Sequence, residues 1–295
     1  MPTPTPQHDF RVYPTLLDAW RGYTHSNEVW ETYWAFSDNP PHTPEQFHTL
    51  QLWRFIDTLN HVDGEPSEPA SRGTAFNELV DCLVEQRPPT FDTEKVRGDD
   101  GHVTHIVAHL DGFSFTFQVA MLKQTAARYN GAVCQYLTQG TLDTRFGSVL
   151  LYGYIDELMP HCIHDIKTTG KYEFPKYKHS AQRLVYPFCC AQQGMDIRRF
   201  DFDVVTFPKY GESEYFTETY IFDTENDTVT LTTWVEEMLD FITEHPSLFT
   251  DKRFFMQSEE RTIGLALMQR DPIGWESQSV EIYNEILNIK HLIEK

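Results

Sequence analysis

An aspartate and a lysine two positions apart are the residues of this chain whose types and spacing could do chemistry. Asp165 and Lys167 lie in the segment 162–168, whose composition predicts a β-strand. Residues two apart in a strand face the same side, so this carboxylate and this ammonium group point together. Of the ten lysines in the chain, only Lys167 has an acidic residue two positions before it.

A second aspartate, Asp156, ends the preceding predicted strand, 146–158. A turn near Pro160-His161 would fold the two strands into a hairpin and bring Asp156 opposite Asp165. Two carboxylates that close repel each other unless one takes up a proton or a cation lies between them. Oxygen ligands suit Mg²⁺, with Mn²⁺ as a possible substitute, and an adjacent lysine could orient or help deprotonate a metal-bound water. The pattern predicts phosphodiester hydrolysis; the alternative is an incidental Asp–Lys pair on a strand.

The helix predicted at 178–193 adds polar groups and positive charge. Gln182 and Tyr186 are four positions apart and share a helix face, where they could bind a phosphate or position the lysine. The alternative is an ordinary packed helix face. Residues 167–183 also carry five basic side chains against one acid, Glu173. In a chain of net charge −20, this segment is where a DNA backbone would bind, unless it is only a solvated helix start.

The elements that must position these residues follow from hydrophobic periodicity. The pattern predicts an α/β core with a mixed sheet, because a helix, three consecutive strands, a helix and a further strand follow one another. Asp111-Gly112 predicts a tight hairpin turn. The predicted helices are 43–60, capped by Thr43, then 73–86, 118–129, 178–193, 230–244 and 276–293. The predicted strands lie within 102–117 and at 132–142, 146–158, 162–168, 200–207 and 215–222.

Composition excludes several classes of protein. The chain has 295 residues, 40% hydrophobic and 23% charged, as expected of a globular protein that can bury a core. It contains no apolar run that could span a membrane and no basic or apolar leader, and its first residues predict an extended tail. Five scattered cysteines without a CxxC pair predict free thiols in a reducing cytoplasm. The absence of a phosphate-binding glycine motif argues against a nucleotide motor.

Three short motifs in this order resemble the PD-(D/E)XK nuclease superfamily, in particular its RecB-like, Cas4-like and lambda-exonuclease-like branch. They are GYID at 153–156, HDIKTTG at 164–170 and QRLVY at 182–186. The helical segment RGTAFNELVDCLVE, which begins at Arg72, resembles the first motif of the same branch. The likeness covers roughly residues 71–208.

The resemblance implies a restriction-endonuclease-like core at 71–223. A helical N-terminal extension at 1–70 and a C-terminal helical region at 224–295 would complete the chain. It implies that Asp156, Asp165 and the backbone carbonyl of Ile166 bind Mg²⁺, that Lys167 is the catalytic lysine, and that Gln182 and Tyr186 line the site.

By the same resemblance, the function is that of a metal-dependent DNA nuclease in a prokaryotic or phage-infected cell. Exonuclease action in recombination, repair or phage DNA processing is favoured, with a recombination protein or a homo-oligomer as a possible partner. A catalytically inactive nuclease-like DNA-binding or scaffold protein is the competing class. An RNA-directed nuclease is a third.

The chain departs from the branch at one position. Where RecB-like members usually have histidine on the first helix, this sequence has Asn77, followed by Glu78. Neighbours on a helix differ in direction by about 100°. Either Asn77 or Glu78 therefore completes the metal site, or the metal is bound there through water. No cysteine follows Cys190, so the iron–sulfur cluster of some relatives is not expected.

Two further groups of residues have weaker functional interpretations. His105 and His109 could face one way and bind Zn²⁺, but no further ligand stands at a recognisable spacing. His164 should face away from Asp165, in a core or surface role. Aromatic residues between Trp20 and Phe36 could stack on bases, although their near-helical spacing is more typical of a packed core.

Overall fold

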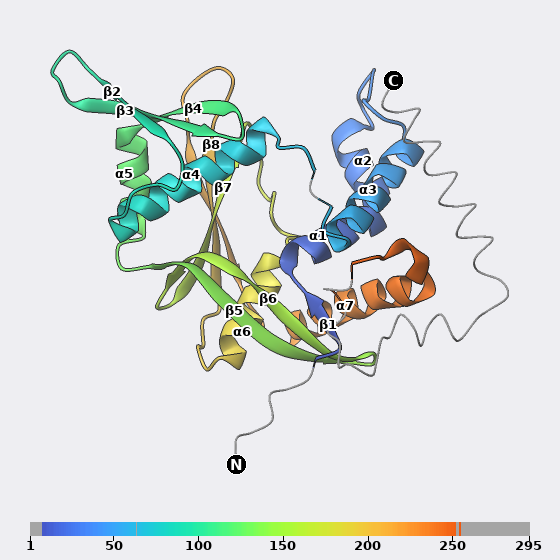
Figure 1. The fold of residues 1–295 in the computed structure, drawn as a ribbon. Coiled ribbons are helices and arrows are strands. Elements are labelled where there is room, and N and C mark those ends of the chain that lie inside the picture. The colour runs from blue at the N-terminus through green and yellow to red at the C-terminus, as the bar shows by residue number, and fades with distance from the viewer. Residues whose placement is uncertain (1–7, 63, 252–253, 255–295) are drawn as a thin grey trace. The chain divides into compact units, whose positions relative to one another are not determined.

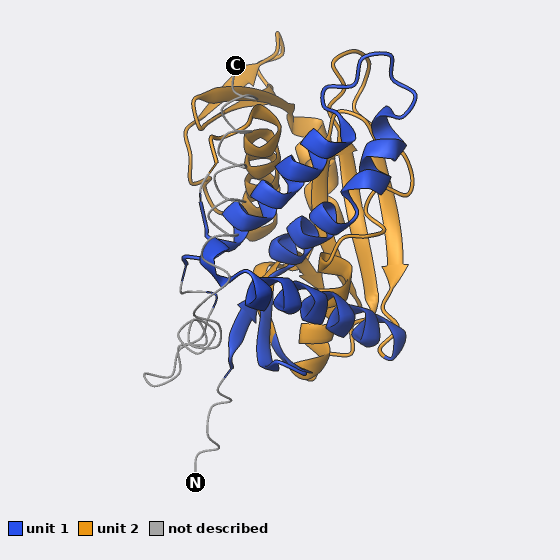
Figure 2. Ribbon diagram, turned by 90° about the vertical axis from the view of Figure 1, so that its right-hand side faces the viewer, with its two compact units in different colours: residues 1–63, 140–152, 225–295 blue, residues 64–139, 153–224 orange. Residues whose placement is uncertain are grey.

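The computed structural model describes residues 8–62, 64–251 and 254. The chain divides into two compact units, each assembled from segments that are separate in the sequence (Figure 2). Unit 1 comprises residues 1–63, 140–152 and 225–295, and unit 2 comprises 64–139 and 153–224. All of the residues predicted to form the nuclease site belong to unit 2.

The described residues form groups of consecutive helices and groups of consecutive strands (Figure 1). The helices are α1 (Pro14–Thr24), α2 (Ser26–Trp34), α3 (Pro44–Leu59), α4 (Glu68–Glu85), α5 (Val119–Arg128), α6 (Gln182–Gln192), α7 (Asn226–Glu244) and the 3₁₀ turn η1 (Pro246–Leu248). The strands are β1 (Phe10–Val12), β2 (Thr93–Arg97), β3 (Val103–Leu110), β4 (Phe113–Gln118), β5 (Val133–Thr144), β6 (Gly147–Met159), β7 (Cys162–Thr169), β8 (Arg199–Thr206) and β9 (Tyr215–Ile221). The larger sheet has both parallel and antiparallel neighbours, so the predicted α/β class with a mixed central sheet and flanking helices is confirmed.

Unit 1 contains the short parallel pairing of β1 with the first half of β6 and the helices α1, α2, α3 and α7. Helix α3 begins as predicted, because Thr43 forms a capping box with Gln46. The buried ring of Trp20 lies 5.2 Å from that of Phe55 and 5.3 Å from that of Phe241. Trp20 is therefore a core residue, whereas Phe36 is fully exposed.

Unit 2 holds the strands that carry the predicted site. The second half of β6 pairs antiparallel with β7 across a turn at Pro160-His161, as predicted. β7 then pairs parallel with β8, and β8 antiparallel with β9. A separate sheet has the order β2-β3-β4, and its hairpin turns at Asp111-Gly112 with positive φ at both residues, as a type I′ turn requires.

The two faces of β7 and β8 pack against different elements. On one face, Ile166 and Val205 join a buried core with residues of α4, α5, β3 and β4. On the other, the ring of Phe200 stacks on Tyr186 of α6 and that of Phe202 on Tyr177. The alternation FDFDVVTF thus places phenylalanines and aspartates on opposite faces of β8.

Several predicted boundaries were wrong. Helix α4 starts five residues before the predicted Gly73, because Ser67 caps it and Pro69 fits the first turn. Helix α6 starts at Gln182 rather than 178. The helix predicted at 276–293 and the N-terminal tail lie outside the described residues. Within the described part of the chain, no helix is both long and apolar enough to cross a membrane.

Candidate active site

The candidate site lies where β6 and β7 stop pairing. Their pairing runs from the turn as far as Glu157 and His164, and continuing the same register sets Asp156 opposite Asp165. At this point a side chain replaces the backbone partner, because Asp156 Oδ2 accepts the Ile166 N–H at 2.9 Å. The carboxylate of Asp156 is thereby held against the Ile166 N–H of β7, and the register agrees with the predicted position of Asp156 opposite Asp165.

Asp165, Lys167 and Gln182 form a closed triangle. The Lys167 ammonium lies 2.6 Å from Asp165 Oδ2 in an ion pair, and it donates to Gln182 Oε1 at 2.8 Å. Gln182 Nε2 in turn donates to Asp165 Oδ1 at 2.5 Å. Asp165 is 1% exposed, so the amide of Gln182 and the ammonium of Lys167 are both fixed against a buried carboxylate.

The two carboxylates and the lysine change one another's protonation. Burial and the neighbouring Asp165 carboxylate raise the pKa of Asp156 to about 8. Burial by itself would lower the pKa of Lys167, but the carboxylates of Asp165 and Asp156 outweigh it and leave this pKa raised. Lys167 is therefore protonated at neutral pH in the metal-free protein. Asp156 is also mostly protonated there, which avoids two adjacent buried negative charges.

Asn77 of α4 reaches the same corner. Its Nδ2 lies 3.4 Å from Asp156 Oδ2 and 3.3 Å from the Ile166 carbonyl oxygen, while its Oδ1 is buried without a hydrogen-bond partner. The nitrogen and oxygen of an amide are assigned from such contacts. A half-turn of this amide would aim the unpartnered oxygen at the place between Asp156 and Ile166.

Glu78 does not join Asn77 at this corner. Both of its carboxylate oxygens accept from the Arg87 guanidinium, at 2.7 and 2.8 Å, and one also accepts from the Thr90 N–H at 2.9 Å. The hydrogen bonds from Arg87 hold the pKa of Glu78 at about 2. Of the two helix residues that the sequence left open, the structure thus brings Asn77, not Glu78, to the carboxylates.

Tyr186 lies one turn beyond Gln182 on α6 and is 5% exposed. Its ring stacks on Phe200 with centroids 6.2 Å apart, which makes the ring part of the packing beneath β8. Its predicted role in lining the site remains a prediction.

A buried acidic cluster next to the site was not predicted. Glu157 follows Asp156 on β6, and Asp81 lies one turn after Asn77 on α4. Both carboxyl groups are almost fully buried, and Cys134 donates to Glu157 Oε2 at 3.1 Å. Burial raises the pKa of Glu157 to about 9, so this carboxyl is neutral at pH 7. No sequence pattern marks an acid for burial on the inner face of a strand, so periodicity could not have found it.

The histidines serve other contacts. His164 faces away from Asp165, as predicted, and its Nδ1 lies 2.9 Å from Asp203 Oδ2. His105 contacts Thr104, and His109 contacts Ser114. Among the described residues, neither His105 nor His109 belongs to a group of ligands that could hold a metal ion, so the zinc alternative for these two histidines gains no support.

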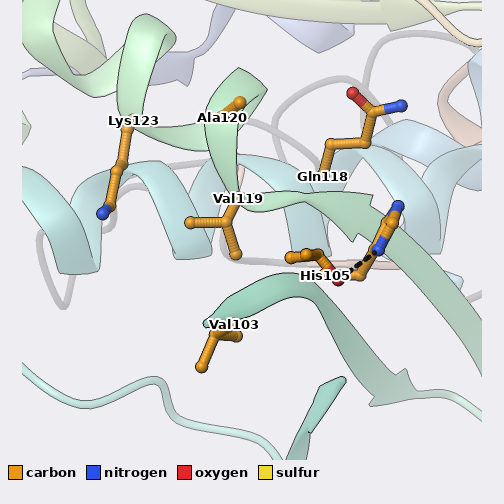
Figure 3. A pocket seen from close by; sticks show the side chains of 7 residues that line it. Val103, His105, Gln118, Val119, Ala120 and Lys123 are labelled. Atoms are coloured by element: carbon orange, nitrogen blue, oxygen red, sulfur yellow. Dashed lines mark hydrogen bonds between the residues drawn. The ribbon is translucent and has the colours of Figure 1, made fainter. Parts of the chain in front are cut away.

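A pocket beside β3 and the start of α5 is lined by His105, Gln118 and Lys123 among others (Figure 3). It contains none of the carboxylates of the candidate site. Within the described chain, the surface feature of Figure 3 is therefore separate from the residues on which the nuclease hypothesis depends.

Comparisons with known proteins give no family assignment. No family model matches the chain, and no curated protein matches its sequence. Among solved structures, the protein SSO0001 aligns over 81% of this chain and 79% of its own, with 10% identity and a TM-score of 0.39. A protein from Eubacterium rectale, provisionally named an exonuclease, aligns over 72% and 80%, with 15% identity and a TM-score of 0.41. Structural similarity this low does not indicate a function for this chain.

Proposed function

We propose that this protein is a metal-dependent DNA nuclease with a PD-(D/E)XK core. The observation that carries the proposal is the convergence of Asp156, Asp165 and Lys167 at the point where β6 and β7 separate. The GYID, HDIKTTG and QRLVY motifs support it, because they resemble the nuclease superfamily in order and in strand–strand–helix context.

The residues present fit a hard divalent cation. The available donors are all oxygens: the carboxylates of Asp156 and Asp165, the Ile166 carbonyl and, after a half-turn of its amide, the unpartnered Oδ1 of Asn77. These groups would hold Mg²⁺ or Mn²⁺, which would supply an activated water and neutralise charge on the phosphate.

Lys167 and Gln182 have distinct parts in this proposal. Lys167 acts on the attacking water or on the phosphate oxygen next to Asp165, and Gln182 fixes the direction of its ammonium through the 2.8 Å hydrogen bond. The two carboxylates raise the pKa of Lys167 in the metal-free protein. Neutralisation of the two carboxylates by a bound cation would lower the pKa of Lys167 and make this lysine a better proton acceptor.

A second candidate is an inactive nuclease-like scaffold or DNA-binding protein. Asn77 favours it, because its amide N–H group already lies against Asp156 Oδ2 and the Ile166 carbonyl, the oxygens that a cation would need. The net charge of −20 also weakens general attraction to nucleic acid. The Asp156–Asp165–Lys167 set speaks against this candidate.

The test is cleavage of end-labelled linear DNA and closed circular DNA, single- and double-stranded, with Mg²⁺, Mn²⁺ or EDTA. Degradation of linear DNA from its ends only with metal supports an exonuclease, and cutting of circles moves the proposal to an endonuclease. Parallel RNA substrates distinguish an RNA-directed enzyme. Binding without cleavage under every metal would favour the scaffold. A role in recombination, repair or phage DNA processing in the cytoplasm belongs to the same proposal.

A further inference from the structure

Two loops of unit 2 follow the C-terminal ends of the neighbouring strands β7 and β8, next to the candidate site. β7 and β8 are parallel neighbours, so the segments that follow them, 170–181 and 207–214, begin side by side. The Phe207 N–H donates to the Thr169 carbonyl at 2.7 Å and ties the two loop starts together. The first loop joins Lys167 on β7 to Gln182 on α6, so it directly borders the proposed chemistry.

The first loop is held in one conformation by a buried acid of β9. Glu218 is 0% exposed, and its carboxylate accepts from the backbone N–H groups of Lys176 and Tyr177 at 3.0 and 2.9 Å and from the Tyr172 hydroxyl at 2.8 Å. The rings of Tyr172 and Tyr177 turn inward onto Phe216 and Phe202 of the sheet.

Between these two inward aromatic residues, the loop holds Phe174 outward, with 74% of its surface exposed. The second loop presents Tyr210 at 82% exposure. Each aromatic residue has lysine nearby in sequence. Lys171 and Lys178 are exposed in the first loop, where Lys171 forms an ion pair with Glu173, and the Lys209 ammonium lies 5.5 Å from the centre of the Tyr210 ring.

Exposed aromatic faces with flanking ammonium groups fit one class of ligand. Unpaired bases stack on aromatic rings without sequence preference, while lysines bind the phosphates between them. A base inside a duplex is already stacked and has no free face to offer. A loop that is ordered before binding loses little conformational entropy when the base arrives.

We propose that Phe174 and Tyr210 form a stacking platform for unpaired nucleotides. The platform would make single-stranded DNA, or the frayed end of a duplex, the form in which substrate reaches Lys167. This inference rests on the proposed nuclease function and adds to it the class of substrate that the site receives.

The test measures binding rather than cleavage, so that its failure is distinct from failure of the nuclease proposal. Fluorescence anisotropy of a labelled poly-dT oligonucleotide in EDTA gives the affinity of the wild type and of Phe174→Ala and Tyr210→Ala. We expect each substitution to weaken binding about 5- to 160-fold, the range for loss of one stacked base. Competition by unlabelled blunt duplex should be weaker than competition by the single strand.

Phe36→Ala is the matched control, because Phe36 is also exposed but lies on unit 1, outside these loops. It should bind like the wild type. Absence of oligonucleotide binding by the wild type, or equal affinity of all four proteins, would overturn the platform. So would a loss of self-association in Phe174→Ala, measured by light scattering, with unchanged oligonucleotide affinity, since the aromatic surface would then bind a second copy of the chain.

Discussion

Asp156 is held in the metal-free protein by the backbone of the neighbouring strand. Its Oδ2 receives the Ile166 N–H, and its pKa is raised to about 8 by burial and by Asp165. An aspartate of ordinary pKa would be ionised well below neutral pH. A nearby positive charge would therefore favour ionisation of Asp156, as expected of a proposed metal ligand beside another carboxylate.

The raised pKa of Asp156 predicts how metal affinity and stability change with pH. Cation binding must displace the proton of Asp156, so Mn²⁺ affinity should rise as the pH increases from about 6 to about 9. In the metal-free protein this carboxyl keeps its proton to higher pH than in the unfolded chain. Its contribution to stability is therefore fully present below about pH 4 and is lost as the pH rises towards 8. Denaturant titrations across this window should show a flatter profile for Asp156→Asn.

The proposed role of Asp156 as a metal ligand predicts which neighbouring substitutions weaken metal binding. Asp156→Asn should reduce Mn²⁺ affinity at least about tenfold, because an anionic ligand is replaced by a neutral one. Glu157→Gln is the matched control, since Glu157 is adjacent but already neutral at pH 7 through its raised pKa. Calorimetric titration with Mn²⁺ measures both. Equal affinities for the two variants would argue that Asp156 is not a ligand.

For single residues, the sequence predicts which side chains face each other across a hairpin better than it predicts which helix residue contacts them. The period of two and the turn at Pro160-His161 predicted the antiparallel register whose continuation sets Asp156 opposite Asp165. The choice between Asn77 and Glu78 was not predictable, because it depends on Arg87, which follows the left-handed Gln86 at the end of α4 and binds Glu78.

Among the elements, the loop at 170–181 depends on a residue that lies far away in sequence. Glu218 binds two of its backbone N–H groups, Lys176 and Tyr177, from within β9. Local sequence patterns cannot predict a contact between residues so far apart in the chain. The sequence accordingly predicted the strand and the helix on either side, but not the ordered loop between them.

The same contact predicts the effect of removing the Glu218 charge. Glu218→Gln should destabilise unit 2 by about 1–3 kcal/mol, because an amide nitrogen would face buried donors that need an acceptor. Hydrogen exchange of the Lys176 and Tyr177 amides should accelerate. The exposed Glu212 in the adjacent loop provides the control, and Glu212→Gln should change neither. Unaltered exchange in Glu218→Gln would mean that other contacts hold the loop.

Element prediction failed mainly where the elements are short or exposed. β1 has three residues, and its pairing partner lies in β6, too far along the chain for a local pattern to indicate. β2 is almost entirely exposed and so lacks the alternation of a half-buried strand. The hairpin of β6 and β7 was predicted because β6 carries buried residues at every second position over most of its length and a turn at Pro160-His161 leads directly into β7.

Over the whole molecule, the chain is more interleaved than its sequence indicates. Three successive regions, 1–70, 71–223 and 224–295, were the expectation. The structure has two compact units, and residues 140–152, which include the tips of β5 and β6, belong with the terminal segments. Long strands that contribute to both units cannot be recognised from composition, because their hydrophobic pattern does not change at the boundary.

The net charge of the molecule predicts a weak dependence of DNA binding on salt. With a charge of −20, attraction to phosphates depends on few lysines, and Lys171, Lys178 and Lys209 lie in the two loops that carry the proposed stacking platform. Three phosphate contacts give a slope of about −2 for log affinity against log salt on single strands. Anisotropy titrations at several salt concentrations measure it. A slope several times steeper would require a larger basic surface than these loops provide.

We propose that Lys167 takes part in phosphodiester hydrolysis beside two carboxylates that bind the metal ion. The most direct measurement is the rate at which Lys167→Ala and Lys95→Ala release nucleotides from labelled linear single-stranded DNA in Mg²⁺, with bound Mn²⁺ determined in parallel. Lys95 is exposed on β2 and outside the site. We predict that Lys167→Ala loses at least about 100-fold in rate while still binding Mn²⁺, and that Lys95→Ala matches the wild type. Equal rates for the two variants would show that Lys167 has no part in the hydrolysis.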